Sequence, residues 1–274
     1  MDPTGPYQVS RPILYLAEEG VLVTENVLGV TLQDKLLSNA KGFVPRSRLS
    51  DLVLDFCRAG EWLRVFHGQT EGYYPGSDLG LAPGPVKDLS RIIDQTHDRL
   101  CRTQGVGVGV MTSTEFEKFE NFLKRQQDEV IHYKRPVCSV HGDFFAGNVM
   151  ISNGAIIGMD FESSTWGDPW FDVSYFLFQL NTLSRKMFYS KSTIEQLSRC
   201  FLEGYGIGLS RSQFWSQMPG PRIILVSHLV SRLLSLQMSL EVSSIRAYLA
   251  RNEIRRLREW LLNCLVEASE PTSP

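Results

Sequence analysis

The sequence predicts an α+β fold in which a short β-hairpin precedes a mainly helical body, and a second β-hairpin is inserted into that body. The first hairpin is indicated by two apolar runs within residues 11–27, which are separated by the turn Glu18-Glu19-Gly20. Helices are indicated from Ser50 onward, where apolar residues recur at spacings of three or four. The second hairpin is indicated by Asn153-Gly154 between two apolar runs, the strongest short-range signal for a hairpin.

The segments around the first hairpin differ in character. Residues 1–10 contain proline and glycine, so we expect them to be frayed. Inside the hairpin, Ile13 and Tyr15 share one side of the first strand, while Leu14 and Leu16 share the other. Residues 25–29 follow as a connector. A short helix is expected next, because Thr31 with Asp34 three residues later forms an N-cap signal.

Helices account for most of the remaining chain. The first long one carries an apolar stripe of Leu52, Phe56, Ala59, Leu63 and Phe66. Further helices are expected over residues 86–101, 114–131, 171–183, 193–204, 223–240 and 245–266. Residues 69–85 are rich in Gly, Tyr and Pro and are expected to be a loop. The Gly-rich run at 105–109 lacks a preceding strand and a following Lys-Ser/Thr, so we interpret it as a connector and not as a phosphate loop.

Composition excludes some classes of protein. With a net charge of -2 over 274 residues, the chain has no strongly basic field, so nucleic acid is not an expected partner. The five cysteines are widely spaced and form no C-x-x-C pair, which indicates reduced thiols and a cytoplasmic location. No apolar run of a signal peptide follows Met1. The apolar stretch from Ile223 to Leu240 is interrupted by His228, Arg232 and Gln237, so a buried helix is expected there and no membrane span.

Three side chains frame the second hairpin and carry the chemistry that we expect. Asn148 starts the hairpin and Asp160 ends it, and an antiparallel hairpin brings its two ends together. One carboxylate and one amide oxygen suit Mg²⁺, which takes its other ligands from phosphate and water. Asp143 lies on the loop that leads into the hairpin, where its natural role is to accept or orient the proton of an attacking hydroxyl.

Each of these positions has a structural alternative when it is taken alone. Asn148 is also suited to cap the hairpin, Asp160 to be an unpaired carboxylate at a strand end, and His141 to be structural. Asp172 is also suited to be a first-turn helix carboxylate. Asp168 precedes a proline and is expected to be a turn or cap residue. The order and spacing of the whole set favour the catalytic interpretation.

The whole set resembles the signature of the aminoglycoside phosphotransferase and choline kinase-like family. The resemblance starts from His141-Gly142-Asp143 with Asn148, followed by Met159-Asp160-Phe161-Glu162. It continues in the segments 23–32, 62–67, 167–172 and 201–205, and covers most of the chain from about Arg11. The resemblance implies a protein kinase-like fold with a partial N-lobe and connector over 1–28, a helical C-lobe over 29–267, and a tail over 268–274.

The resemblance also implies an activity and roles for residues. The activity is transfer of the γ-phosphate of ATP, with Mg²⁺, to a hydroxyl of a small molecule. Asp143 would be the catalytic base, and Asn148 and Asp160 would bind Mg²⁺. His141 and Asp172 would hold the catalytic loop from behind.

The connector backbone from Glu25 to Val27 would meet the adenine. The phosphate acceptor, the choice between ATP and GTP, and the oligomeric state stay open. An acidic pocket for a cationic acceptor is one possibility, with Glu162, Asp168 and Glu203 as candidates beside their surface or structural roles.

The sequence departs from the family pattern before the first hairpin. Kinases of this type use a Gly-rich β-loop and a strand lysine to hold the phosphates. Here the first lysine is Lys35, which lies beyond the connector. Three explanations compete: the chain is a fragment or starts too late, it is an inactive relative that binds nucleotide or a partner, or another cation such as Arg11 substitutes. A metal-dependent phosphoester hydrolase would need more clustered ligands than this chain offers.

Overall fold

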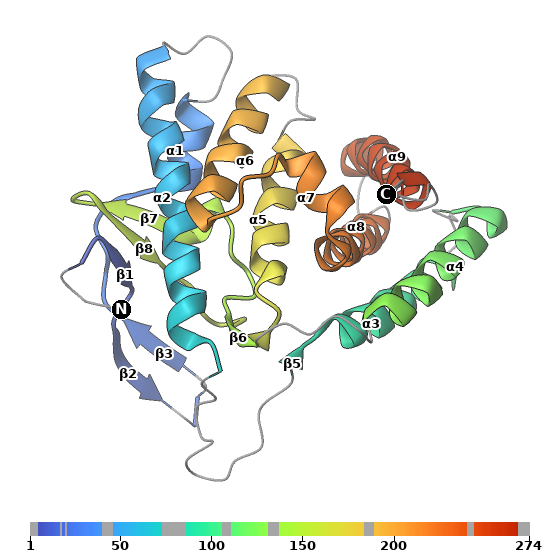
Figure 1. Ribbon diagram of the computed structural model, residues 1–274, viewed down its shortest axis with the longest axis horizontal. Coiled ribbons are helices and arrows are strands. Elements are labelled where there is room, and N and C mark those ends of the chain that lie inside the picture. The colour runs from blue at the N-terminus through green and yellow to red at the C-terminus, as the bar shows by residue number, and fades with distance from the viewer. Residues whose placement is uncertain are drawn as a thin grey trace. The chain divides into compact units, whose positions relative to one another are not determined.

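The computed structural model describes residues 5–16, 18–19, 21–39, 46–72, 86–105, 111–130, 137–183, 189–239 and 244–267 (Figure 1). The contacts divide the chain into two compact units. Unit 1 consists of Met1–Pro85 and Pro136–Arg211, and unit 2 consists of Val86–Arg135 and Ser212–Pro274. Each unit is therefore built from two stretches of chain, and the first stretch of unit 2 is inserted into unit 1. The lobe boundaries expected from the sequence stay a prediction.

The main sheet of unit 1 is built around the second hairpin. Strands β7 (Val149–Ser152) and β8 (Ala155–Gly158) pair antiparallel, as the Asn-Gly signal predicted. The turn residues Asn153 and Gly154 both have positive φ angles, 47° and 78°, which is the conformation that an Asn-Gly turn favours. Strand β4 (Val30–Thr31) extends the sheet beside β7, and β1 (Tyr7–Val9) extends it beside β8.

The expectation that residues 1–10 are frayed is wrong for residues 7–9. They form β1, which runs parallel to β8 with Tyr7 opposite Ile156. The Trp62 indole N–H also donates to the Gln8 carbonyl at 2.6 Å. Both partners are remote in sequence, so local composition does not reveal the strand. Residues 1–4 lie outside the described part of the chain.

The first hairpin is confirmed. Strands β2 (Pro12–Leu16) and β3 (Val21–Thr24) pair antiparallel and form a sheet of their own, with part of the predicted turn (residues 17 and 20) outside the described residues. Apolar side chains on both faces are exposed, for example Ile13 at 62% and Leu14 at 50%. An apolar surface that covers both faces of a hairpin is uncommon in a monomeric protein.

The described part of unit 1 contains four helices that lie wholly within it: α1 (Leu32–Asn39), α2 (Arg46–Thr70), α5 (Trp170–Leu183) and α6 (Lys191–Tyr205). Helices α1 and α2 contact its main sheet, and α6 packs against α2 and α5. The predicted cap of α1 is confirmed, because the Thr31 hydroxyl accepts from the Asp34 N–H at 3.0 Å. The 3₁₀ turn Ala146–Asn148 leads into β7. Two three-residue strands, β6 (Cys138–Val140) and β9 (Thr165–Gly167), pair antiparallel and were too short for prediction.

Unit 2 is helical apart from the short strand β5 (Val86–Lys87). Its helices are α3 (Leu89–Gly105), α4 (Ser113–Val130), α8 (Pro219–Ser239) and α9 (Ser244–Glu267). Helix α7 (Arg211–Gln217), which was not predicted, crosses the boundary between the units. The predicted loop over residues 69–85 and the Gly-rich connector lie mainly outside the described residues. Within the part that is described, no helix combines the length and apolar character that crossing a bilayer requires.

The core of unit 1 is a row of stacked aromatic rings. Trp62 of α2 stacks on Phe144 with ring centroids 5.3 Å apart. Phe144 stacks on Phe176 of α5, which stacks in turn on Phe201 of α6 at 3.9 Å. These four side chains are almost completely buried. Since Phe144 belongs to the loop between β6 and β7, the row fixes that loop to three helices.

Helices α2 and α6 approach each other closely at two glycines. A Cβ atom on Gly60 would lie 2.1 Å from the carbonyl oxygen of Phe201, and one on Gly204 would lie 1.9 Å from that of Cys57. Backbone oxygens cannot move aside as a flexible side chain would. Only glycine therefore permits this helix packing, although glycine costs about 1 kcal/mol relative to alanine inside a helix.

We expect Gly60→Ala to lower the free energy of unfolding by about 1–3 kcal/mol, because the added methyl group forces the two helices apart. Gly68→Ala is the matched control: it lies in the same helix, and no atom lies within 4 Å of the position that its methyl group would take. That substitution should raise the free energy of unfolding by about 0.5–1 kcal/mol. Urea unfolding of both variants measures the difference, and equal effects at the two positions would contradict the packing argument.

Candidate active site

The carboxylate of Asp172 organises the loop that contains Asp143. Asp172 lies in the first turn of α5 and is completely buried. One oxygen accepts from the backbone N–H of His141 at 2.6 Å, and the other accepts from the N–H of Gly142 at 2.8 Å. The first oxygen is also 3.0 Å from Nε2 of His67. The structure therefore brings His141 and Asp172 together at the loop, as the resemblance implied.

His67 and Tyr205 extend this network, and sequence reasoning did not assign either residue to the site. His67 is buried in α2, and its Nδ1 lies 2.9 Å from the Tyr205 hydroxyl at the end of α6. The His67 side chain thus links Asp172 of α5 to Tyr205 of α6. The one signal in the sequence was the presence of His67 and Tyr205 in the segments that resembled the family. The two residues are 138 positions apart in the chain, so sequence spacing alone does not predict their contact.

The surroundings of Asp172 lower its pKa. Burial alone would raise the pKa, but the hydrogen bond from His67, the charges of His67 and His141, and the N–H of Gly142 outweigh that effect. The ionised carboxylate is therefore the form that the folded protein stabilises. An ionised acceptor also makes stronger hydrogen bonds to the loop than a neutral one.

His141 anchors the loop to the far end of the hairpin. Its Nε2 lies 2.8 Å from the Met159 carbonyl, so the ring donates there. The ring also packs on Phe161 at 4.6 Å and on Phe144 at 5.6 Å. His141 is completely buried. Because the ring is buried, it cannot contact a substrate that binds from solution. These contacts therefore give His141 a positioning role.

Asp143 and Asn148 are joined directly. The Asn148 amide nitrogen lies 2.9 Å from the Asp143 carbonyl and 3.2 Å from the Asp143 carboxylate. Since the amide nitrogen is the donor in both contacts, the Asn148 amide oxygen points elsewhere and keeps its lone pairs. Asp143 itself is partly exposed, so its carboxylate can reach a ligand.

The hairpin places Asp160 next to Asn148, as its geometry predicted. The β7–β8 ladder ends at Val149 opposite Gly158, and the Met159 N–H then donates to the Asn148 carbonyl at 3.0 Å. Asp160 follows immediately and is exposed. Its φ angle is 61°, a left-handed conformation that is uncommon for a residue other than glycine. Such backbone strain is typical of positions where function fixes the direction of a side chain.

The donor set suits a hard divalent cation. The Asn148 amide oxygen and the Asp160 carboxylate are oxygen ligands, and Mg²⁺ usually takes only one or two from the protein. Among the described residues, no group of three or more His, Cys, Asp or Glu side chains is placed to hold a metal ion. A magnesium ion here would therefore depend on Asn148, Asp160, phosphate and water.

The connector expected to meet a nucleotide is tied to the same sheet. Glu25 and Val27 are both half-buried, and the connector leads into β4, which pairs with β7. At Gly29 a Cβ would lie 2.4 Å from the Ile151 carbonyl, so the chain passes tightly against β7 here. The structure thus joins the connector to the hairpin that ends at Asp160.

Two cations that flank the connector in the described part of the chain, Arg11 and Lys35, are engaged in ion pairs. Arg11 lies 3.7 Å from the Glu25 carboxylate, and Lys35 pairs with Asp55. The Arg11 backbone N–H also donates to the Glu25 side chain at 2.9 Å. Glu25 therefore shapes the connector through both its backbone and its side chain.

Two of the three acidic candidates for a cationic pocket have structural partners. Asp168 is buried and accepts from the Trp170 N–H at 2.8 Å, which confirms it as the cap of α5. Glu203 pairs with Arg199 one turn away in α6. Glu162 is exposed in the turn after Asp160.

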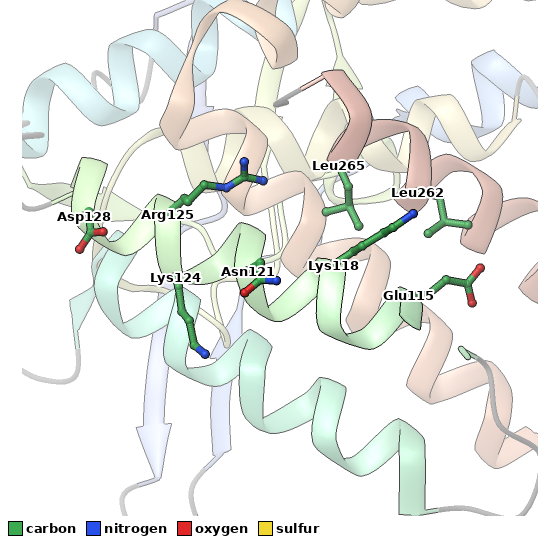
Figure 2. A pocket seen from close by; sticks show the side chains of 8 residues that line it. All are labelled: Glu115, Lys118, Asn121, Lys124, Arg125, Asp128, Leu262 and Leu265. Carbon is green, nitrogen blue, oxygen red and sulfur yellow. The ribbon is translucent and has the colours of Figure 1, made fainter. Parts of the chain in front are cut away.

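Unit 2 has a groove of about 710 Å³ between α4 and α9 (Figure 2). Leu262 and Leu265 of α9 line one side, and charged residues of α4 such as Lys118 and Arg125 line the other. Glu115 at one end pairs with Arg258 at 2.7 Å. No residue predicted for the active site lines this groove.

Solved structures share this fold. A choline/ethanolamine kinase family protein from Mesorhizobium loti has a TM-score of 0.57 and 16% identity, over 95% of this chain and 78% of that one. A thermostable mutant of aminoglycoside phosphotransferase APH(4)-Ia, in a ternary complex with ADP and hygromycin B, has a TM-score of 0.60 and 15% identity, over 98% and 80%. Amicoumacin kinase hAmiN in complex with AMP-PNP, Ca²⁺ and Ami has a TM-score of 0.58 and 16% identity, over 98% of this chain and 74% of that one.

These likenesses define a kinase-like fold, as the resemblance implied. Residues 75–215, just over half of the chain, match the model of the phosphotransferase enzyme family, so the chain belongs to that family. No curated protein sequence matches it. Family and fold together support a small-molecule phosphotransferase.

Asp172→Asn should lower the free energy of unfolding by about 3 kcal/mol at neutral pH, because the loop loses its ionised acceptor. The native pKa of Asp172 lies below its usual value of about 3.9, so this contribution is complete above that value and is lost as the pH falls through the native pKa. The stability difference between parent and variant should therefore shrink in acid. Urea unfolding at several pH values measures it.

Tyr205→Phe is the control for that experiment. It removes the hydroxyl that contacts His67 and leaves Asp172 intact, so it should cost about 1 kcal/mol with no added acid dependence. A difference between parent and Asp172→Asn that is equally large at every pH would show that the carboxylate charge does not stabilise the loop.

Proposed function

We propose that this protein transfers the γ-phosphoryl group of ATP, with Mg²⁺, to a hydroxyl group of a small molecule. One observation carries the proposal. Asp143 and Asn148 are hydrogen-bonded to each other on a loop that the buried Asp172 holds, and the adjoining hairpin places Asp160 beside Asn148. A base and two oxygen ligands on one fixed frame are central parts of a site for phosphoryl transfer.

Asp143 would orient the acceptor hydroxyl and accept its proton as the new bond to phosphorus forms. Phosphoryl transfer depends mainly on position and on charge neutralisation. The amide of Asn148 holds the Asp143 carboxylate, and Asp172 holds the two backbone N–H groups that immediately precede it, those of His141 and Gly142. The position of the base is thus set by hydrogen bonds and not by a mobile loop.

Asn148 and Asp160 would hold the Mg²⁺ ion. When bound there, the ion neutralises charge on the phosphate oxygens of the nucleotide. The contacts of the Asn148 amide nitrogen turn its amide oxygen away from Asp143. The oxygen would thus be left for the metal ion, and the Asp143 carboxylate for the acceptor hydroxyl. The left-handed backbone of Asp160 would direct its carboxylate to the same ion.

The connector from Glu25 to Val27 would meet the adenine of ATP. The aminoglycoside phosphotransferase and amicoumacin kinase structures described above are complexes with ADP and AMP-PNP, which supports a nucleotide site. All five cysteines are free thiols, which supports action in the reducing cytoplasm.

A second candidate is a catalytically impaired relative that binds nucleotide or a partner without transfer. The ion pairs of Arg11 and Lys35 favour it, because these two cations, which flank the connector in the described part of the chain, each have a carboxylate partner. Nucleotide binding without a free cation at the phosphates would be weak and would leave the γ-phosphate poorly positioned.

One experiment separates the two candidates. ADP release is measured with Mg·ATP and with acceptors of several classes, including an aminoglycoside, an amino alcohol and an amino sugar, and thermal unfolding is followed alongside. A kinase gives acceptor-dependent ADP. An impaired relative is stabilised by Mg·ATP and gives no product with any acceptor. A chain that gives neither ADP nor a thermal shift overturns both.

Asp143→Ala should reduce transfer by about 10²–10⁴-fold, because the hydroxyl loses its base. It should retain the thermal shift caused by Mg·ATP. Transfer at the parental rate would remove Asp143 from the catalytic role while leaving the proposed reaction intact.

Asp160→Asn should abolish the part of the ATP-induced thermal shift that depends on Mg²⁺, since the ion loses its only charged protein ligand in the proposed site. Glu162→Gln is the matched control, because it removes an exposed carboxylate two residues away. Similar Mg²⁺ dependence in the parent and in Asp160→Asn would show that the ion binds elsewhere.

A further inference from the structure

The first turn of α1 lies against the turn that joins Asp143 to the second hairpin. Helix α1 contacts the 3₁₀ turn Ala146–Asn148 as well as β7 (Figure 1). A Cβ atom on Gly147 would lie 2.8 Å from Oε1 of Gln33. The Gln33 amide therefore lies directly beside the backbone that precedes Asn148, in space that a side chain at position 147 would otherwise take.

The polar groups of Gln33 are uncommitted, unlike those of its polar neighbours on α1. Thr31 and Asp34 hydrogen-bond to each other as the cap of the helix, and Lys35 pairs with Asp55. The Gln33 side chain is half-buried, and its amide makes no hydrogen bond to any residue that the structure describes. Its two N–H donors and its acceptor oxygen are therefore available to a ligand.

Gln33 also lies between the two ends of the proposed nucleotide site. The connector of residues 25–27 leads through β4 into α1, so Gln33 is one short strand beyond the expected adenine. Its contact with Gly147 places it next to Asn148, a proposed ligand of Mg²⁺. In ATP the ribose joins the base to the phosphates. A nucleotide with its base at the connector and its phosphates at the metal ion would thus have its ribose beside Gln33.

On the basis of the proposed nucleotide site, we propose that the Gln33 amide binds the ribose hydroxyls and makes the site selective for a ribonucleotide over a deoxyribonucleotide. An N–H of the amide donates to one hydroxyl oxygen, and the amide oxygen accepts from the other hydroxyl. One carboxamide thereby satisfies both members of the 2′,3′-diol. Removing the 2′-hydroxyl leaves part of the amide without a partner, which lowers the affinity for the nucleotide.

The test compares Mg·ATP with Mg·2′-deoxyATP on the full chain by isothermal titration calorimetry. The parent should bind ATP about five- to tenfold more tightly than deoxyATP, the loss expected for one neutral hydrogen bond. Gln33→Leu should weaken the binding of ATP more than that of deoxyATP, so that the two nucleotides bind equally. At saturating ATP its transfer rate should stay near the parental rate, because the amide contacts the sugar and not the reacting phosphate.

Two further variants separate a ribose contact from simple packing against Gly147. Gln33→Glu keeps the length of the side chain, and its carboxylate can accept from both hydroxyls, so the preference for ATP should be retained. Gln127→Leu is the matched control, because it makes the same change at an exposed position of α4 in unit 2. It should keep the parental dissociation constants. Thermal unfolding without nucleotide checks that each variant is folded.

Two results would overturn the ribose contact while ATP still binds. One is equal affinity of the parent for ATP and deoxyATP. The other is an equal weakening of both nucleotides in Gln33→Leu, which would show that Gln33 only supports the turn at Gly147. A sugar preference that Gln33→Leu abolishes upholds the contact even in a chain that transfers no phosphate, so failure of the proposed transfer is recognised separately. A parent that binds neither nucleotide overturns both the contact and the nucleotide site.

Discussion

The loop that contains Asp143 depends on one buried negative charge. Removing a carboxylate from water costs several kcal/mol unless hydrogen bonds replace its hydration. Asp172 accepts from two successive backbone N–H groups and from His67, which repays that cost and fixes the loop at His141 and Gly142. The same contacts lower its pKa, so the protein stabilises the form that holds the loop most strongly.

Packing supports the same loop from the other side. Phe144 belongs to a row of aromatic rings that includes side chains of α2, α5 and α6. The close approach of α2 and α6 at Gly60 and Gly204 holds together the two helices that carry the outer members of that row. The loop is therefore held by charge at one end and by apolar contact in the middle, and Asp143 lies between the two.

Local signals in the sequence accounted for much of the fold and for the frame of the site. Asn153-Gly154 predicted the hairpin, and the hairpin in turn predicted that Asn148 and Asp160 are neighbours. Elements whose partners are remote were not predictable in this way. Strand β1 exists because β8 pairs with it, and β6 and β9 contain only three residues each. His67 contacts Asp172 and Tyr205, which lie 105 and 138 positions further along the chain, and no local periodicity predicts such contacts.

Those long separations have a consequence for how the protein is made. During synthesis the loop at Asp143 emerges before Asp172 and Tyr205, so it has no buried acceptor when it first leaves the ribosome. The insertion of Val86–Arg135 further delays the meeting of α2 with α5 and α6. Non-local contacts of this kind form slowly, because the chain must close large loops before any contact rewards it. The frame of the site is therefore among the last parts of unit 1 to assemble, and a chain interrupted before Asp172 would lack the buried acceptor that holds the loop at Asp143.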